Sequence, residues 1–191
     1  GGVLFEHGHR MTAGVVGLMT FALGAWIGLR EKRAAVRRLA ALAVAGIVVQ
    51  AILGGITVLY QLPKGISIAH ACLGQAVFCA LLAIAQLTAP ANAQYSPSLG
   101  AGFRRAGALA VGVLYLQLLL GAIFRHTGNG IVWHAAGAVA VLAALGALCR
   151  KTFTQAAREP ALCRPAALLV AALPIQLILG LVSYLARDIK F

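Results

Sequence analysis

Three histidines occupy equivalent places in this chain, each close to the start of a long apolar stretch. His9 and His70 are 61 residues apart, and His70 and His134 are 64 residues apart. A single buried histidine usually just hydrogen-bonds to a neighbour, but three in equivalent positions indicate a shared chemical role. Two imidazoles that project from facing helices into a bundle core can ligate a b-type heme without covalent attachment. We therefore predict that His9, His70 and His134 are ligands of heme iron.

The first of these histidines belongs to a charged cluster, Glu6-His7-Gly8-His9-Arg10, directly before an uncharged run over residues 11–29. Charge is costly near a bilayer, so such a cluster at a membrane helix end is a candidate functional site. Glu6 can simply stabilise the positive end of a helix dipole. Alternatively, Glu6, which is three residues from His9, acts as a general base or stabilises a developing cation beside the heme. The second interpretation makes Glu6 the predicted catalytic residue.

Two arginines and two further histidines lie close to the predicted ligands. Arg10 and Arg125 are placed to pair with heme propionates, or Arg10 with the Glu6 carboxylate; the alternative is an interfacial arginine that reaches toward water. His7 and His126 fall in or beside loops and are predicted to be solvated or supporting. Proton relay is a weaker alternative, because relays normally use several buried carboxylates and only Glu6 is near.

The elements that must position these residues are membrane-spanning helices. Of the 191 residues, 61% are hydrophobic and only 10% are charged, whereas roughly a quarter are charged in soluble domains. Close spacing of small residues, as in Gly14/Gly17 and Gly137/Ala140, lets helix backbones approach. We predict an all-α polytopic membrane protein. Six stretches are long enough to cross roughly 30 Å of hydrocarbon: residues 9–29, 39–59, 67–87, 106–124, 131–148 and 166–185, the last containing Pro174.

The positive charge of the chain indicates membrane orientation rather than nucleic-acid binding. Its net charge is +12, but the basic residues sit in short loops between apolar stretches. Eleven lie on one side, which should be cytoplasmic, and five on the other, so that the histidine-bearing helix ends face outward. The eleven are Arg30, Lys32, Arg33, Arg37, Arg38, Arg104, Arg105, Arg150, Lys151, Arg158 and Arg164; the five are Arg10, Lys64, Arg125, Arg187 and Lys190.

A short motif, Gln-x-x-Leu-Gly, occurs at the same topological place in three apolar stretches, starting at Gln50, Gln117 and Gln176. His70 follows the first copy by twenty residues, and His134 follows the second by seventeen. The repeating unit is a helix pair, one helix going out with the motif and one returning with a histidine near its start. Two complete pairs and two half pairs are present. We therefore expect an intact protein of eight helices with four such histidines.

The four cysteines, Cys72, Cys79, Cys149 and Cys163, show no CxxC, zinc or CxxCH spacing. We predict that they are small packing residues rather than ligands or a disulfide framework.

These motifs together resemble the heme A synthase family over essentially the whole chain. Glu6 to Arg10 matches that family's E-x-x-H-R. The second element is Gln50-Ala51-Ile52-Leu53-Gly54-Gly55-Ile56-Thr57-Val58 followed by His70. The third is Gln117 to Gly121 with Arg125-His126-Thr127-Gly128-Asn129-Gly130 and His134.

The resemblance implies a particular fold. The family has eight transmembrane helices in two similar four-helix bundles, and the chain resembles helices two to seven. It then comprises an N-terminal bundle over residues 1–87, a cytoplasmic linker over 88–105 and a C-terminal bundle over 106–191, each bundle with three of its four helices. The second ligand of the heme b bound by His134 would lie beyond Phe191, so we expect this chain alone to be inactive. Many bacterial members carry an outer-loop cysteine pair, which none of the four cysteines here matches.

The resemblance also implies an activity. The family oxidises the C8 methyl of heme O to the formyl group of heme A, for cytochrome oxidase maturation. His9 and His70 would flank the substrate heme, Glu6 would be the catalytic carboxylate, and His134 would ligate heme b. Successive hydroxylation would give a gem-diol that loses water. Expected partners are heme O, membrane lipid, heme O synthase or cytochrome oxidase assembly proteins, and a second copy of the chain, but not nucleic acid. The expected location is the bacterial inner (plasma) membrane.

Two other functions remain open from the residues themselves. A non-catalytic diheme electron carrier of the membrane would share the histidines but would have no use for Glu6. A heme-free transporter or assembly factor would use the repeat only as architecture.

Overall fold

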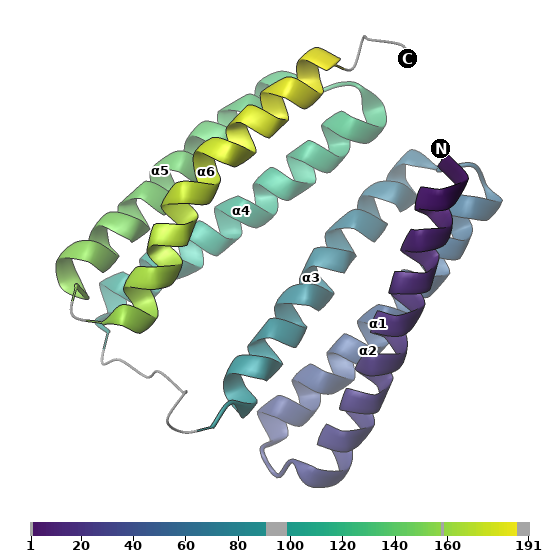
Figure 1. Cartoon of the computed structure of the whole chain (residues 1–191), viewed down its shortest axis with the longest axis horizontal. Helices are drawn as coiled ribbons and strands as arrows, with labels where there is room; N and C mark the ends of the chain where they lie inside the picture. Colours follow the sequence, from purple (N-terminus) through teal and green to yellow (C-terminus); the bar gives the residue numbers. More distant parts are fainter. Residues whose placement is uncertain (1, 91–98, 158, 187–191) are drawn as a thin grey trace. The chain divides into compact units, whose positions relative to one another are not determined.

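The computed structural model describes residues 2–90, 99–157 and 159–186; within these ranges it contains six α-helices and no strand (Figure 1). Each helix is long and apolar enough to cross a membrane, which confirms the predicted all-α, multi-pass fold. The helices are α1 (Gly2–Arg30), α2 (Ala34–Leu59), α3 (Lys64–Thr88), α4 (Ala101–Thr127), α5 (Ile131–Gln155) and α6 (Pro160–Ala186).

The helices are longer than the apolar stretches that predict them. A helix satisfies its own backbone hydrogen bonds, so it continues through polar residues at the membrane surface. The cluster from Glu6 to Arg10 consequently lies inside α1, and α4 begins at Ala101, within the predicted linker 88–105. Residues 91–98 of that linker, together with Arg158, Arg187 and Lys190, fall outside the described residues.

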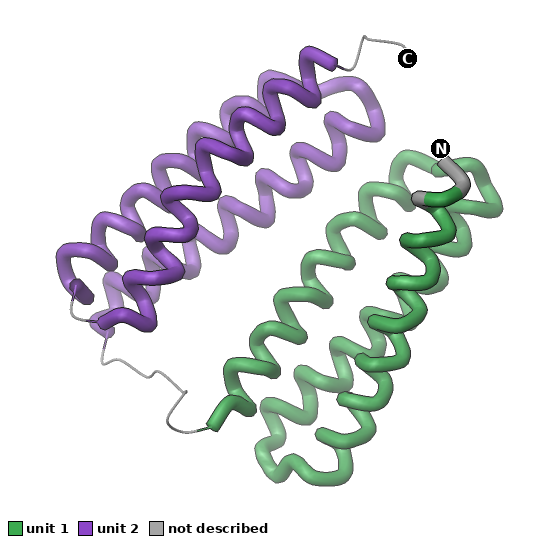
Figure 2. Tube along the Cα trace, viewed as in Figure 1, with its two compact units in different colours: residues 1–94 green, residues 95–191 purple. Residues whose placement is uncertain are grey.

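The chain divides into two compact units, residues 1–94 and residues 95–191 (Figure 2). In unit 1, α2 contacts both α1 and α3, and in unit 2, α5 contacts both α4 and α6. The backbones of α1 and α3 stay more than 8 Å apart throughout the described residues. In unit 1, therefore, α2 is the central helix, and side chains alone bridge the space between α1 and α3.

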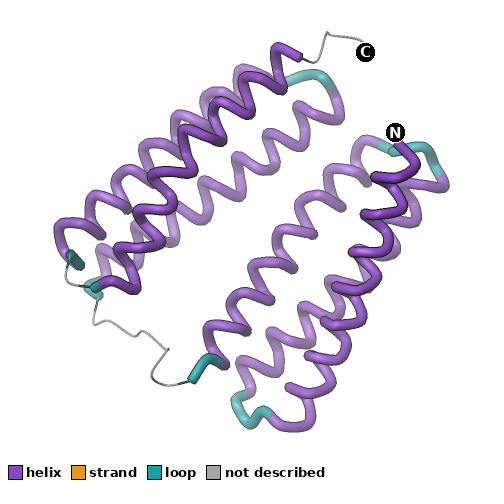
Figure 3. The backbone as a smooth tube through the Cα atoms, viewed as in Figure 1, coloured by secondary structure: helices purple, strands orange, loops and turns teal. Residues whose placement is uncertain are grey.

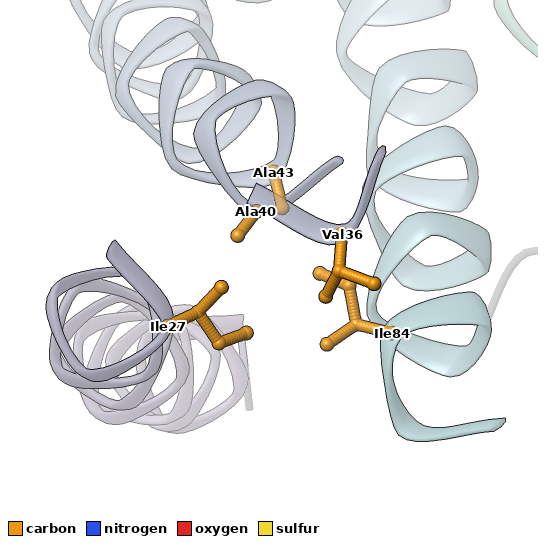
Figure 4. Close-up of a cluster of buried hydrophobic side chains, with 5 residues drawn as sticks. All are labelled: Ile27, Val36, Ala40, Ala43 and Ile84. Carbon is orange, nitrogen blue, oxygen red and sulfur yellow. The ribbon is translucent and has the colours of Figure 1, made fainter. Parts of the chain in front are cut away.

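An apolar cluster holds the three helices of unit 1 together at the end that carries the α1–α2 loop (Figure 4). Ile27 of α1 and Ile84 of α3 meet Val36, Ala40 and Ala43 of α2 there. The predicted histidine site lies at the opposite end of the same helices, so the cluster fixes their spacing without entering the site.

The α1–α2 loop is also hydrogen-bonded to the end of α3. Arg33 makes an ion pair with Glu31 at 2.7 Å, and its Nη1 donates a hydrogen bond of 2.7 Å to the backbone carbonyl of Leu87. Hydrogen bonds from Arg33 lower the pKa of Glu31 to about 2, and the same pairing raises the pKa of Arg33.

The two loops at the histidine ends are coloured teal in Figure 3. They differ in residue type, although both contain residues with left-handed backbone. The α4–α5 loop uses glycine, with Gly128 at φ 76° and Gly130 at φ 90°. The α2–α3 loop places Gln61 and Leu62 at φ 54° and 61°, a conformation that costs a residue with a Cβ roughly 1–2 kcal/mol.

Neither the cysteines nor Pro174 alters this architecture. Cys72, Cys79, Cys149 and Cys163 form no disulfide, and the Cys149 thiol lies 3.7 Å from the carbonyl oxygen of Ala166. α6 runs through Pro174 without ending.

Candidate heme site

The rings of His9 and His70 face one another across the space between α1 and α3. Their centroids are 6.5 Å apart and their planes are nearly perpendicular, at 79°. Metal–imidazole bonds are roughly 2 Å long, so two axial imidazoles on one iron place their ring centroids roughly 6 Å apart. The structure therefore brings together two predicted ligands at a separation that fits a six-coordinate heme iron.

The donor set favours heme over a metal ion held by protein ligands alone. Among the described residues, no group of three or more His, Cys, Asp or Glu side chains is close enough to hold a metal ion. Structural and catalytic zinc sites use at least three protein ligands. A pair of imidazoles is instead the axial set of a b-type heme, whose porphyrin supplies the other ligands.

The imidazole of His70 lies against α2 because Gly54 offers no side chain there. A Cβ built on Gly54 would lie 3.3 Å from Cε1 of the His70 ring. The second helix pair repeats the arrangement, since a Cβ on Gly121 of α4 would lie 2.9 Å from Cε1 of His134 in α5. The final glycine of the first two Gln-x-x-Leu-Gly motifs is thus the residue against which the returning histidine packs.

In the first two motifs, the glutamine lies one helical turn before the glycine and also packs against the histidine-bearing helix. The Gln117 side-chain amide donates a 3.0 Å hydrogen bond to the backbone carbonyl of His134, and its Oε1 lies against Gly137. The Nε2 of Gln50 likewise lies 2.7 Å from where a Cβ of Gly74 would be. Each glutamine therefore helps to fix the position of the histidine-bearing helix along the axis of the motif-bearing helix.

Both Gln–His pairs leave the same polar atoms unsatisfied. The side-chain Oε1 of Gln50 and Gln117 and the Nδ1 of His70 and His134 are buried without a hydrogen-bond partner. A buried polar atom without a hydrogen-bond partner destabilises the folded state, so its presence calls for an explanation, such as a functional role. Their recurrence in both units indicates a repeated site rather than an accident of one helix pair.

Glu6 and Arg10 form an ion pair on α1. The Arg10 Nη2 lies 3.0 Å from Glu6 Oε1, and about half of each side chain is exposed. Glu6 stands one helical turn before His9, a spacing that places both on the same face of α1. Because α1 begins at Gly2, Glu6 lies in its second turn rather than at its first residues, which weakens the helix-dipole interpretation.

The predicted ligand of unit 2 has an aromatic neighbour. The ring of His134 stacks on Phe124 with centroids 6.2 Å apart and planes inclined by 17°, and Phe124 also lies 6.2 Å from Tyr184 of α6. Arg125 and His126 occupy the last turn of α4, where basic side chains favour the negative end of the helix dipole.

Some residues of the site escaped the sequence analysis. Gly74 and Gly137 accept the glutamine side chains, and Phe124 stacks on a predicted ligand. A signal was present for the glycines: each lies one turn after its histidine, in His70-x-x-x-Gly74 and His134-x-x-Gly137. The exposed and half-buried residues around Phe124 offer no comparable pattern.

Helix pairs that span the membrane, each with an imidazole held between its helices, define a multi-pass membrane protein with candidate heme-ligand positions. The chain matches a family model, COX15-CtaA, described as cytochrome oxidase assembly protein, over residues 2–133. It belongs to this family, as the resemblance to heme A synthases predicted, and membership supports a role in cytochrome oxidase assembly. No curated protein and no solved structure matches the chain. The matched range contains His9 and His70 and ends one residue before His134.

Proposed function

We propose that this protein acts in heme A synthesis, oxidising the C8 methyl of heme O to a formyl group in the bacterial inner membrane, with its histidine ends on the outer side. One observation carries the proposal: in a member of a cytochrome oxidase assembly family, the ring centroids of His9 and His70 lie 6.5 Å apart between α1 and α3. An imidazole pair at that spacing suits a heme, and the family context supplies a reason for binding one.

His9 and His70 would hold the substrate heme between α1 and α3, with one imidazole from each helix. The apolar surroundings of α1 to α3 would exclude bulk water from the porphyrin faces, while Arg10 would remain close enough to the rim to pair with a propionate. His134 would provide one ligand to a heme b in unit 2. That heme would supply one-electron redox chemistry when bound.

The conversion of a methyl to a formyl group is a four-electron oxidation. Two successive hydroxylations, each withdrawing two electrons and two protons when water supplies the oxygen, give a gem-diol, and loss of one water from it leaves the aldehyde. The electrons would pass to a membrane electron carrier. Removal of hydride or of an electron pair from the methyl carbon leaves positive charge there, which a fixed carboxylate stabilises.

Glu6 is the residue placed for that task. It lies on the His9 face of α1, and its ion pair with Arg10 at 3.0 Å orients the carboxylate. A carboxylate in that position can also accept a proton released from the hydroxylated carbon.

The test compares Glu6→Gln with wild type and with Glu159→Gln, which removes one carboxylate in unit 2. Heme content is measured from the Soret band, and heme O and heme A are separated and identified by mass spectrometry from membranes of cells that express the full-length protein with each change. We expect Glu6→Gln to keep its heme and to lose heme A formation by roughly 10²–10⁴-fold, as for loss of a general base, with Glu159→Gln unchanged.

The same experiment separates the other candidate functions. Retained heme and unchanged heme A formation in Glu6→Gln would favour the electron carrier. Absence of a Soret band in the wild-type protein would favour a heme-free assembly factor and would refute the proposal.

A further inference from the structure

We propose that Gly54 and Gly121 are positioning residues that hold the imidazoles of His70 and His134 in the orientation needed to ligate heme iron. The inference rests on the proposed heme site and adds residues that carry no chemistry of their own. It also explains why the last residue of the Gln-x-x-Leu-Gly motif is glycine.

The contact recurs in both units, and Cε1 is the ring atom closest to the glycine in each. At Gly54 the atoms of His70 within 4 Å of an added Cβ are Cε1 and Nδ1, at 3.3 and 3.9 Å. At Gly121 the Cε1, Nδ1 and Nε2 atoms of His134 lie at 2.9, 3.4 and 3.7 Å from an added Cβ. Each ring therefore turns its Cε1 toward the glycine, and Nδ1 is the nearer of its two nitrogens.

That orientation determines which nitrogen is available to a metal. Nδ1 of both rings is buried and makes no hydrogen bond, whereas Nε2 of neither ring is among the buried, unsatisfied atoms. An imidazole ligates iron through one nitrogen only, so burial of Nδ1 against the neighbouring helix leaves Nε2 as the ligand atom. The glycine thus selects the ligating nitrogen by allowing the ring to approach the backbone.

A neighbouring glycine shows that the contact is not general to the helix. Gly55, adjacent to Gly54 on α2, has nothing within 4 Å of an added Cβ. The close approach to His70 is therefore a property of position 54.

The size of the expected effect follows from the distances. An Ala at position 54 would require the His70 ring to retreat by a few tenths of an ångström, and at position 121 the clash is more severe. Ligand geometry must hold within about 0.5 Å for tight binding, and loss of support around a metal ligand typically lowers affinity about 10–100-fold. We expect roughly a tenfold loss of heme affinity for Gly54→Ala and a larger loss at its own site for Gly121→Ala.

The test titrates hemin into the purified full chain, as wild type, Gly54→Ala, Gly121→Ala and the matched control Gly55→Ala. Soret absorption gives the affinity, and the EPR signal of the ferric heme reports the relative orientation of the axial ligands. We expect weaker binding and a changed low-spin signal for Gly54→Ala, weaker binding for Gly121→Ala, and wild-type behaviour for Gly55→Ala. Thermal unfolding of the heme-free variants identifies any that fail to fold.

A heme-free readout keeps the inference separate from the proposed function. In the chain labelled with ¹⁵N-histidine, we expect the imidazole resonances of His70 and His134 to shift in the corresponding alanine variant and not in Gly55→Ala. Wild-type affinity and spectra in both alanine variants would overturn the inference while leaving the heme site in place. Equal losses in Gly55→Ala would also overturn it, by assigning the effect to helix packing. A wild-type chain without any Soret band would refute the proposed function, and unchanged histidine resonances would then refute the glycine contact as well.

Discussion

Gly46 of α2 packs against Val77 of α3, and replacing this glycine should separate the two helices. A Cβ on Gly46 would lie 2.5 Å from Cγ2 of Val77 and 3.9 Å from its Cβ. Val77 is only 6% exposed, and a valine in a helix strongly prefers one rotamer, so its methyl cannot easily turn away. The helices must therefore shift.

The magnitude follows from two opposing terms. Overpacking of a tight contact costs about 1–3 kcal/mol, while replacing glycine by alanine inside a helix gains about 0.5–1 kcal/mol. We expect Gly46→Ala to lower the free energy of unfolding of unit 1 by about 1–2 kcal/mol. Gly55→Ala on the same helix, which meets nothing within 4 Å, should instead be neutral or slightly stabilising.

A double-mutant cycle tests the reason for the loss. Val77→Ala removes the methyl that the new Cβ would strike, so Gly46→Ala/Val77→Ala should be more stable than the sum of the single changes by about 1–3 kcal/mol. Unfolding is followed in detergent by Trp26 fluorescence in a Trp133→Phe background, which reports on unit 1. Additive losses would refute the reasoning, because they would show that the two side chains do not meet.

Three further changes test other contacts. Leu62→Gly should raise the melting temperature, because it removes left-handed strain of about 1 kcal/mol; no rise would show that the loop is unstrained. The pKa of Glu31 is lowered from 4.5 to about 2 in the folded chain, so its stabilising effect is complete above pH 4.5 and is lost as the pH falls toward 2. Arg33→Gln should remove that part of the acid sensitivity, measured as melting temperature between neutral pH and about pH 3; identical acid profiles would contradict the ion pair. Gln117→Leu removes a hydrogen bond to a backbone carbonyl of α5 and should lower the free energy of unfolding of unit 2 by about 0.6 kcal/mol. Gln176→Leu, at an exposed position of α6, should leave this free energy unchanged. Equal effects of the two changes would argue against a specific hydrogen bond.

The fold follows from the sequence because a membrane imposes a strong constraint on it. Apolar length predicted every helix, since a spanning segment must satisfy its own backbone hydrogen bonds. Helix ends were less predictable, because hydropathy stops at the polar surface and the helix does not. The cluster from Glu6 to Arg10 was expected at the start of a helix, over residues 9–29, and lies within the longer α1 for that reason.

Residue types and spacing predicted the histidine pair but not its packing. The repeat indicated that His9, His70 and His134 are equivalent, and the structure brings the first two to 6.5 Å. It did not indicate that His134 stacks on Phe124. Such a contact depends on the rotation of α4 about its axis, which an Ala- and Leu-rich helix with apolar residues on all faces does not encode as an amphipathic pattern.

Small residues illustrate the same limit. Close spacing of Gly14 and Gly17 predicted a tight helix contact, yet a Cβ added at Gly17 would lie 3.6 Å from an Ile47 methyl, while one added at Gly14 would meet nothing within 4 Å. Spacing alone shows that a helix can approach a neighbour; which of its glycines does so depends on the crossing of the two helices.

The chain of helix contacts has a consequence for biosynthesis. Every close backbone contact joins helices that are consecutive in sequence, α1 with α2, α2 with α3, α4 with α5 and α5 with α6. Such local contacts can form as soon as the second helix of each pair leaves the translocon, because little chain must be closed into a loop. His70 can then reach Gly54 and His9 before α4 has been translated. The histidine pair of unit 1 can therefore assemble while the ribosome is still making unit 2.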